Sequence, residues 1–507
     1  MKLYSYSIGL ILIFLLPFSL LAQKVSKVEV LNADVFEFIK QGNEQIKKLK
    51  GNCQFKQENT LFYCDSALLY DVKNMVDAYG KVRIVQGDSL QLFGDFLNYD
   101  GNNKIAKFNK NVKVIHNDMV LTTQVLTYDT KNKIATYPQG GKIVNIDNVL
   151  TSTFGYYYAN TSDAYFKKNV VLTNPKYILK SDTLKYNSKT RIATFYGPTT
   201  ITSEEDYLYA EAGTYNTITD IAQFTKNPLY KSGSQSLTGE FLYYDRNKGL
   251  GRANKNISFI DTAQKIILRG DKANYNRNTE SSVVTNNAYV VVLVDNDSLF
   301  LSADTLKSFM DKNMTYRTLV AYHKVKAYKT DLQASCDSMV YTYIDSTMRC
   351  YTNPTIWSQN AQMTADFISL ELKNGDLNKM NLFNNAFLVM VDTLDTLKFD
   401  QIKGKNMFGY FVNNELQLLD VEGNGQSIYF AKEEEKPGEY LGVNRADCSN
   451  MTIRFKENKV QKVNFKVKPD AVFSPLDKVN EEDLKLKGFT WRIKLRPTSK
   501  ESVVKRR

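Results

Sequence analysis

The chain has 507 residues, in which Tyr (32) and Phe (28) are abundant while Pro (10) and Trp (2) are few. This composition favours strands joined by polar turns over a helical protein. The only histidines, His116 and His323, leave little material for a His-based triad or metal site, so neither an enzyme nor a cofactor is expected. The formal net charge is +12, but basic and acidic residues alternate over most of the chain, which argues against a nucleic-acid partner.

The first element along the chain is a predicted secretory signal over residues 1–22. Lys2 supplies the positive start, residues 8–21 are apolar, and Ala22 provides the small residue of a cleavage site. The alternative is an uncleaved membrane anchor, for which this apolar stretch is short. Because Gln23 and not Cys follows, no lipoprotein anchor is expected, and the mature chain should be soluble outside the cytoplasm.

A 29-residue repeat dominates the sequence that follows. Its first aromatic column is Tyr70, Tyr99, Tyr128, Tyr157, Tyr186, Tyr215 and Tyr244. Its second column is Tyr79, Phe108, Tyr137, Phe166, Phe195 and Phe224. Leucines stand two residues before most members of the first column, at Leu68, Leu97, Leu126, Leu184 and Leu242. Units of this size cannot each bury a core alone, so the repeat predicts a stacked array.

Within a unit the side-chain pattern has a period of two. Residues 112–116 and 119–123 are β-rich and flank the two polar residues Asn117 and Asp118, which is a hairpin signal. Successive hairpins imply antiparallel pairing. The prediction is an all-β, elongated antiparallel repeat array over residues 23–465, with no helix before the C-terminal tail.

Acidic residues form a further column four positions before the tyrosines, including Asp95, Asp182, Glu211 and Glu240. An active site is needed once, whereas this column recurs in most repeats. We therefore expect a hydrogen-bonding role at strand ends or turns and not catalysis.

Five cysteines occur, and in an oxidising compartment two pairs could close hairpin-sized loops. The expected disulfides are Cys53–Cys64 and Cys336–Cys350, which leaves Cys448 free. The spacing of the five matches no usual zinc pattern.

The last segment, residues 466–507, is predicted to be a basic tail, with its positive charge concentrated between Lys485 and Arg496. An attraction to anionic lipid or sugar-phosphate head groups fits the overall charge, and the alternative is a solvated surface.

The repeat unit resembles the OstA-like family, the periplasmic bridge of lipopolysaccharide transport. The matching stretches are Leu97-Asn-Tyr99-Asp100, Ala106-Lys-Phe108, Asn111-Val112, Leu184-Lys-Tyr186-Asn187 and Ala193-Thr-Phe195, and the ending Lys487-Gly-Phe-Thr-Trp-Arg492 looks like the tail of long OstA-like chains. The resemblance implies an open β-jellyroll of two sheets in a V, a periplasmic location associated with the outer membrane, and an apolar interior for the acyl chains of lipopolysaccharide or a similar glycolipid. It also implies head-to-tail stacking with other jellyroll components of the bridge and the outer-membrane translocon.

The candidate groove lining consists of leucines and phenylalanines from the two columns. These are Leu97, Leu126, Leu184, Leu242, Phe108, Phe166, Phe195 and Phe224. The same pattern is expected of a packed interior, because both arrangements need one apolar side per strand. The alternative functions are a structural β-repeat scaffold and a carbohydrate-binding or β-helical protein of the envelope.

Overall fold

Alternation of apolar and polar side chains builds long antiparallel strands in the computed structural model, which describes residues 26–504 apart from 43, 294–296, 374–375, 434–437 and 457–458. In residues 90–93 and 97–100, for example, buried and half-buried side chains follow one another strictly. The predicted all-β, antiparallel repeat class is confirmed. The predicted signal at residues 1–22 lies outside the described residues, and no described helix is both long and apolar enough to span a bilayer.

The chain divides into two units, Met1–Ala164 and Tyr165–Arg507. The strands of the first unit are β1 (Glu29–Asn32), β2 (Val35–Gln41), β3 (Glu44–Gln57), β4 (Thr60–Tyr70), β5 (Met75–Gln86), β6 (Leu90–Asp100), β7 (Ile105–His116), β8 (Met119–Asp129), β9 (Ile134–Tyr137), β10 (Gly141–Asn145), β11 (Asn148–Ser152) and β12 (Phe154–Tyr158). Strand β13 (Asp163–Asn174) contains the division.

The second unit continues with strands of the same kind. They are β14 (Tyr177–Asn187), β15 (Ile192–Thr202), β16 (Asp206–Asn216), β17 (Ile221–Thr225), β18 (Leu229–Ser232), β19 (Gln235–Thr238), β20 (Phe241–Asp245), β21 (Leu250–Asp261), β22 (Ile266–Asn276), β23 (Ser281–Thr285), β24 (Tyr289–Val292), β25 (Leu299–Ser302), β26 (Thr305–Met310), β27 (Arg317–Tyr328), β28 (Gln333–Thr342), β29 (Thr347–Tyr351), β30 (Thr355–Ser358), β31 (Ala361–Thr364), β32 (Phe367–Lys373), β33 (Asp376–Val391), β34 (Phe399–Val412), β35 (Glu415–Lys432), β36 (Tyr440–Lys456), β37 (Lys459–Lys466) and β38 (Asp470–Ser474).

Short helical elements complete the second unit. The 3-10 turns are η1 (Arg277–Thr279), η2 (Leu476–Lys478), η3 (Glu481–Leu484) and η4 (Ile493–Leu495), and the α-helix is α1 (Lys500–Val504).

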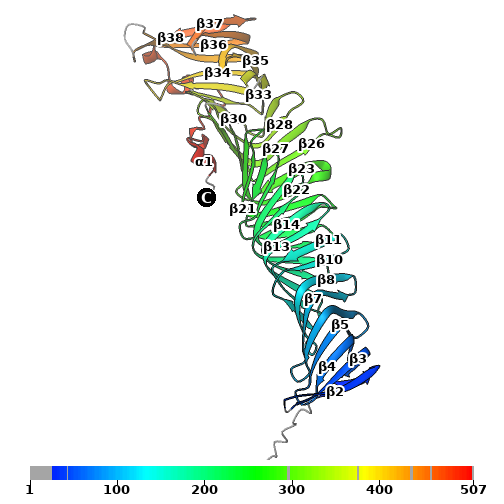
Figure 1. Ribbon diagram of the computed structural model, residues 1–507. Helices are drawn as coiled ribbons and strands as arrows, with labels where there is room; N and C mark the ends of the chain where they lie inside the picture. The colour runs from blue at the N-terminus through cyan, green and yellow to red at the C-terminus, as the bar shows by residue number, and fades with distance from the viewer. Residues whose placement is uncertain are drawn as a thin grey trace, which may run out of the picture. The chain divides into compact units, whose positions relative to one another are not determined.

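Strands that follow one another in sequence pair as hairpins in each unit (Figure 1). The predicted two-residue turn at Asn117 and Asp118 is confirmed, because His116 of β7 lies opposite Met119 of β8. Where a long strand is interrupted, its two parts pair with the two halves of the same neighbour: β9 and β10 both pair with β8. Each unit is therefore a ladder of antiparallel rungs.

Several long strands, β3, β5, β7, β13, β21, β27, β33 and β35, bend near their middle, where two consecutive residues adopt left-handed backbone; neighbours such as β4, β6 and β8 carry no such pair. In β7 the two residues are Lys110 (φ 64°) and Asn111 (φ 50°), and the register with β8 shifts at this point. A bulge of this kind bends a strand and increases its twist. The strand halves consequently form two walls, named here wall A (which contains residues 105–109) and wall B (which contains residues 112–116).

The two walls face each other across an apolar interior. The ring of Phe62 in wall B lies 4.5 Å from the ring of Tyr99 in wall A. Both walls turn alternate side chains inward, such as Leu97 and Leu92 of β6, which are fully buried. Two facing walls joined at the bend are the predicted jellyroll architecture.

Three members of the acidic column, Asp95, Asp182 and Glu211, lie in the middle of a strand, at the bend, whereas Glu240 lies directly before β20. Asp95 accepts a hydrogen bond of 2.7 Å from the Asn111 side chain, and Glu211 accepts one of 2.9 Å from Asn227. Since each asparagine belongs to the left-handed pair of a neighbouring strand, the acidic residue holds the bend in place. The predicted hydrogen-bonding role is present; the predicted strand-end location holds for Glu240, which accepts from Asn256 at 2.7 Å, and is wrong for Asp95, Asp182 and Glu211.

The first repeat is offset by one residue from the predicted columns. In β4 the inward side chains are Ala67 and Leu69, whereas Leu68 and Tyr70 lie on the other face. Tyr79 of β5, assigned to the second column, is likewise 41% exposed. Because side chains alternate with a period of two, a slip of one residue moves a whole column to the opposite face.

The expected disulfides are not formed, since all five cysteines are free thiols. Cys53 and Cys64 do lie directly opposite each other, but both are buried in the interior. Burial raises the pKa of Cys64 to about 12, which suppresses the thiolate needed for disulfide exchange. These thiols serve as small apolar side chains of the core.

Glycines make room for the aromatic columns within the ladder. A Cβ at Gly213 of β16 would lie 2.5 Å from the Phe195 ring and 2.4 Å from the Gln223 carbonyl oxygen. At Gly251 of β21 the nearest atom would be 3.5 Å away, which is an ordinary contact. The aromatic column is therefore packed directly over the backbone of its neighbours.

We expect Gly213→Ala to destabilise the second unit by about 1–3 kcal/mol, because the added methyl group overpacks the space beside Phe195. Gly251→Ala is the matched control and should change stability by less than about 0.5 kcal/mol. Urea unfolding followed by circular dichroism measures both. Equal midpoints for the two variants would contradict the packing described.

Candidate functional site

The candidate groove residues form cross-strand rows on the inner face of wall A. In the first unit Leu97, Phe108 and Leu126 lie directly opposite one another on β6, β7 and β8. In the second unit the row runs Leu184, Phe195, Gly213, Phe224 and Leu242. Phe166, on β13, is also fully buried. The sequence columns thus correspond to rows of neighbours in space.

All eight residues are buried, with exposed fractions between 0% and 5%. Wall B supplies the opposite side of the interior with Leu92, Val114 and Leu121, which are equally buried. In this structure the interior is consequently closed around the rows, and any ligand must part the walls to reach them.

Paired glutamine contacts close the rim of the first unit, where the free ends of the walls meet. The Tyr99 hydroxyl of wall A donates to Oε1 of Gln57 in wall B, while Gln57 Nε2 donates to the Gly101 carbonyl at 2.9 Å. One repeat further, Tyr128 donates to Gln86 Oε1 and Gln86 Nε2 donates to the Thr130 carbonyl at 2.7 Å. We call these contacts rim latches.

A third latch uses a histidine in place of glutamine. The Tyr157 hydroxyl lies 2.5 Å from His116 Nδ1. Burial, followed by the charge of Lys133, lowers the pKa of His116 below its usual 6.5, so the neutral ring is favoured. Burial also raises the pKa of Tyr99 to about 12, which keeps that latch protonated at neutral pH. The sequence columns contained the tyrosines but missed their partners.

Tyr215 of the second unit is tied differently. The Tyr215 hydroxyl donates to Asp220 Oδ1 at 2.7 Å, and its ring meets Tyr177 edge-on at 5.1 Å. Asp220 belongs to the turn that follows β16 and not to wall B. The hydrogen bond to Asp220 stays on the side of wall A, while the Tyr177 ring, on the wall B half of β14, meets Tyr215 across the rim.

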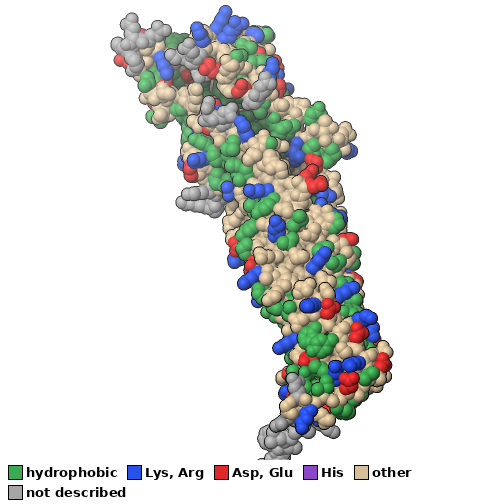
Figure 2. Space-filling model, in the orientation of Figure 1, with side chains coloured by type: hydrophobic (Ala, Val, Ile, Leu, Met, Phe, Trp, Pro, Cys, Tyr) green, Lys and Arg blue, Asp and Glu red, His purple; other side chains and the backbone are tan. Residues whose placement is uncertain are grey.

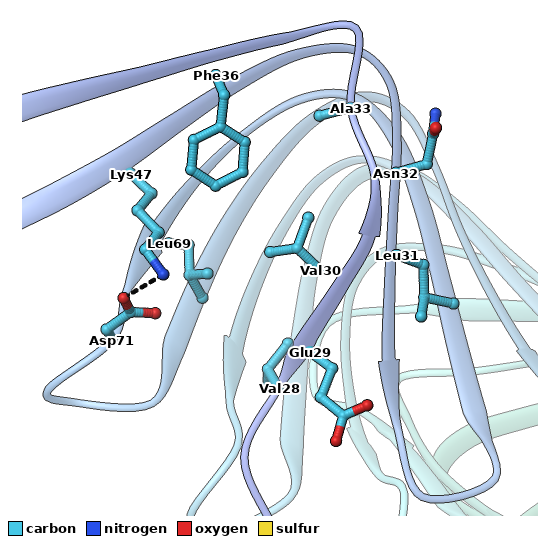
Figure 3. Close-up of a pocket in the computed structure, with 10 residues that line it drawn as sticks. All are labelled: Val28, Glu29, Val30, Leu31, Asn32, Ala33, Phe36, Lys47, Leu69 and Asp71. Atoms are coloured by element: carbon cyan, nitrogen blue, oxygen red, sulfur yellow. Dashed lines mark ion pairs between the residues drawn. The ribbon is translucent and has the colours of Figure 1, made fainter.

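A hollow of about 640 Å³ lies at the first rungs of the first unit (Figure 3). Figure 3 shows Phe36, Leu69 and Val30 around a common space, with the Lys47–Asp71 ion pair (2.5 Å) beside it. Leu69 is also an inward residue of wall A. The hollow therefore lies on the surface, at the end of the interior.

Over the described part of the chain, no three His, Cys, Asp or Glu side chains lie close enough together to hold a metal ion. Basic and acidic side chains are interspersed on the face drawn in Figure 2. The arrangement found is an apolar interior with a hydrogen-bonded rim.

Comparison with known proteins supports the resemblance drawn from the repeat. Residues 25–182 match the family described as OstA-like protein, which confirms the resemblance over that segment. One similar solved structure is LptH of Pseudomonas aeruginosa, described as the LptA homologous periplasmic component of the lipopolysaccharide transport device. It is 13% identical, the alignment covers 27% of this chain and 81% of that chain, and the TM-score is 0.15. No curated protein matches the sequence.

We expect Tyr128→Phe to lower the free energy of unfolding by about 1–3 kcal/mol, because buried Gln86 Oε1 loses its donor. The double variant Tyr128→Phe/Gln86→Leu should lose less stability than the sum of the two single variants, since each single variant already breaks the Tyr128–Gln86 hydrogen bond. Tyr156→Phe, at a part-exposed tyrosine of β12, is the control and should change little. Urea unfolding of wild type, the two single variants and the double variant completes a double-mutant cycle. Strictly additive changes in the free energy of unfolding would contradict a direct contact between Tyr128 and Gln86.

The His116 latch should make stability depend on pH. Because the folded-state pKa of His116 is depressed, the unfolded chain binds the proton more readily, and stability is lost as pH falls below about 6.5. His116→Gln copies the neighbouring latches and lacks this titration. The melting temperature of wild type relative to His116→Gln should therefore fall between about pH 7.5 and pH 5.5. A pH-independent difference would show that His116 does not titrate in the latch.

Proposed function

We propose that this protein is an exported, periplasmic lipid carrier that binds the acyl chains of lipopolysaccharide or a similar glycolipid between its two walls. In this proposal it takes part in lipopolysaccharide transport toward the outer membrane, without catalysis. The match of residues 25–182 to the OstA-like family supports it. So does the apolar stretch at residues 8–21, which reads as an export signal.

The observation that carries the proposal is the row of equivalent apolar positions along each interior. Leu97, Phe108 and Leu126 occupy the same place on successive rungs, one strand spacing apart. A chain of methylenes lying along such a row meets a similar surface at each rung. The lipid can then move from one rung to the next without passing through water.

The free energy gained by burying an acyl chain is larger than the free energy of the hydrogen bonds that close the rim of the first unit. Burial of an acyl chain is worth about 0.8 kcal/mol for each methylene, hence roughly 8 kcal/mol for ten. A typical hydrogen bond contributes only about 0.5–1.5 kcal/mol net, so the hydrogen bonds described for the three latches together stabilise the closed rim by less than the burial of one chain. The walls touch at the rim through side chains, and the backbone ladders of each wall stay intact when they part.

The near-complete burial of the eight row residues also suits a second function, a structural scaffold with a packed core. Both functions need the same rows, and they differ in whether the rim opens. The hollow lined in part by Phe36 and Leu69 favours the carrier, because it lies at the end of the apolar interior.

Exposed edge strands provide places for further jellyroll components to pair. Strand β2 bonds to β3 alone among described strands and exposes Phe36 and Phe38. Strand β38 bonds to β36 alone among them and exposes Val472 and Phe473. We propose that these edges stack head to tail with bridge or translocon components, or with a second copy, by adding strands to the ladder.

A photoreactive phenylalanine analogue tests the interior directly, because it is apolar and close to phenylalanine in size. Placed in turn at Phe108, Phe166 and Phe224, it should capture labelled lipopolysaccharide at all three positions in cells. The reason is that the proposed path passes every rung.

The matched control places the same analogue at Tyr196, which neighbours Phe195 but is 54% exposed on the other face. Capture there should be weak. Capture at none of the three interior positions, from protein shown to be folded, would leave the scaffold as the function.

A further inference from the structure

The C-terminal segment after β38 lies across the outside of the second unit. Figure 1 shows it in red, running back past β30 and β27 to α1. Leu486 and Val503 are fully buried, so the segment is docked and not a free tail. We call residues 475–504 the strap.

Two glutamines of the sheet hold the strap backbone in the same way. Gln401 Nε2 donates to the Leu484 carbonyl at 2.8 Å, and its Oε1 accepts from Leu486 N–H at 2.9 Å. Gln362 does the same with the Thr490 carbonyl and Arg492 N–H, at 2.7 and 2.6 Å. Each amide thus binds the carbonyl of one residue and the N–H two residues on, as a neighbouring strand would.

An apolar cluster beneath the strap fixes it further. On β33, Phe387 and Val389 face the strap while Leu388 between them faces the interior. The strap contributes Phe489 and Trp491, whose rings lie 5.2 and 5.4 Å from Phe399. The strap consequently covers the outer face of the sheet, and its conformation is fixed over several rungs.

The other side of the strap is cationic. Residues 485–500 contain six Lys and Arg and no acidic residue. The two arginines bind the sheet, Arg492 at Thr355 Oγ1 (3.0 Å) and Arg496 at Gln333 Oε1 (2.8 Å). The four lysines are exposed, and no ion pair joins any of them to a described carboxylate; they are Lys485, Lys487, Lys494 and Lys500.

Two aliphatic side chains project among these lysines. The turn η4 exposes Ile493 (41%) and Leu495 (55%) on either side of Lys494. An acidic run at residues 481–483 precedes the basic stretch, but its Asp483 lies 3.9 Å from Arg445. The outward surface therefore combines unpaired positive charge with exposed aliphatic groups.

We propose that the strap is a docking element for an anionic lipid surface. Lysines near such a surface are attracted to it, while Ile493 and Leu495 enter the boundary between head groups and acyl chains. An acidic protein partner fits less well, because a stable protein interface needs about 1,200 Å² or more of buried surface and the exposed apolar part is two side chains. The inference does not depend on lipid passing through the interior.

The test is co-sedimentation of the chain from Gln23 onward, which keeps every described residue, with phospholipid vesicles. Vesicles containing phosphatidylglycerol should bind the protein and vesicles of phosphatidylcholine alone should not. The variants Ile493→Ser/Leu495→Ser and Lys485→Glu/Lys487→Glu/Lys494→Glu should each weaken binding at least about tenfold, since each lysine near the surface is worth roughly a fivefold change. All changed side chains are exposed, and Lys485 lies 5.8 Å from the Phe489 ring, so the melting temperature should fall only slightly.

Matched controls change exposed residues of the same types elsewhere in the second unit. They are Ile218→Ser/Ile344→Ser for the aliphatic pair and Lys231→Glu/Lys272→Glu/Lys326→Glu for the charge. These control variants should bind the vesicles within about twofold of wild type. Because they change the net charge equally, the comparison distinguishes binding by the strap from a general effect of net charge. Equal binding to neutral vesicles, or strap variants no weaker than the controls, would overturn the proposal.

Discussion

The fold depends on the left-handed residue pair in the middle of alternate long strands, such as β3, β5 and β7. A straight strand of this length would add to a single sheet with one apolar face left uncovered. The bend lets the same strand contribute to both walls, so each rung covers its own apolar side chains. Glycine and asparagine suit this backbone, and the Asp95–Asn111 type of hydrogen bond holds it in successive repeats. The apolar interior between the two walls therefore depends on this backbone conformation.

The walls are joined by backbone at the bend and by side chains at the rim. This difference makes the rim the natural place for the interior to open, because breaking Tyr128–Gln86 leaves every backbone ladder intact. In the second unit, Gln362 and Gln401 also use both atoms of the side-chain amide. They hold the backbone of the strap on the outer face of the sheet. Glutamine side-chain amides thus close the rim in the first unit and fix the strap in the second.

The repeat columns predicted the antiparallel rungs and the rows through Phe108 and Phe195, because both follow from spacing along one strand. The prediction placed the columns of the first repeat on the wrong face. That repeat is offset by one residue, which cannot be seen in a degenerate motif, so Tyr79 points to the outer face. The partners of the tyrosines could not be predicted, because Gln57 lies 42 residues from Tyr99 and is brought to it only by the closed rim. The strap contacts likewise depend on tertiary packing, although the basic composition of residues 485–496 was evident.

The central claim is that the interior holds acyl chains, and the most direct measurement is mass spectrometry of organic extracts from the gently purified, folded protein. The account predicts a co-purified glycolipid with several acyl chains, whose amount falls when Phe108 or Phe195 is replaced by tryptophan to fill the row. A folded protein that yields no lipid, or the same lipid from the filled variants, would contradict it.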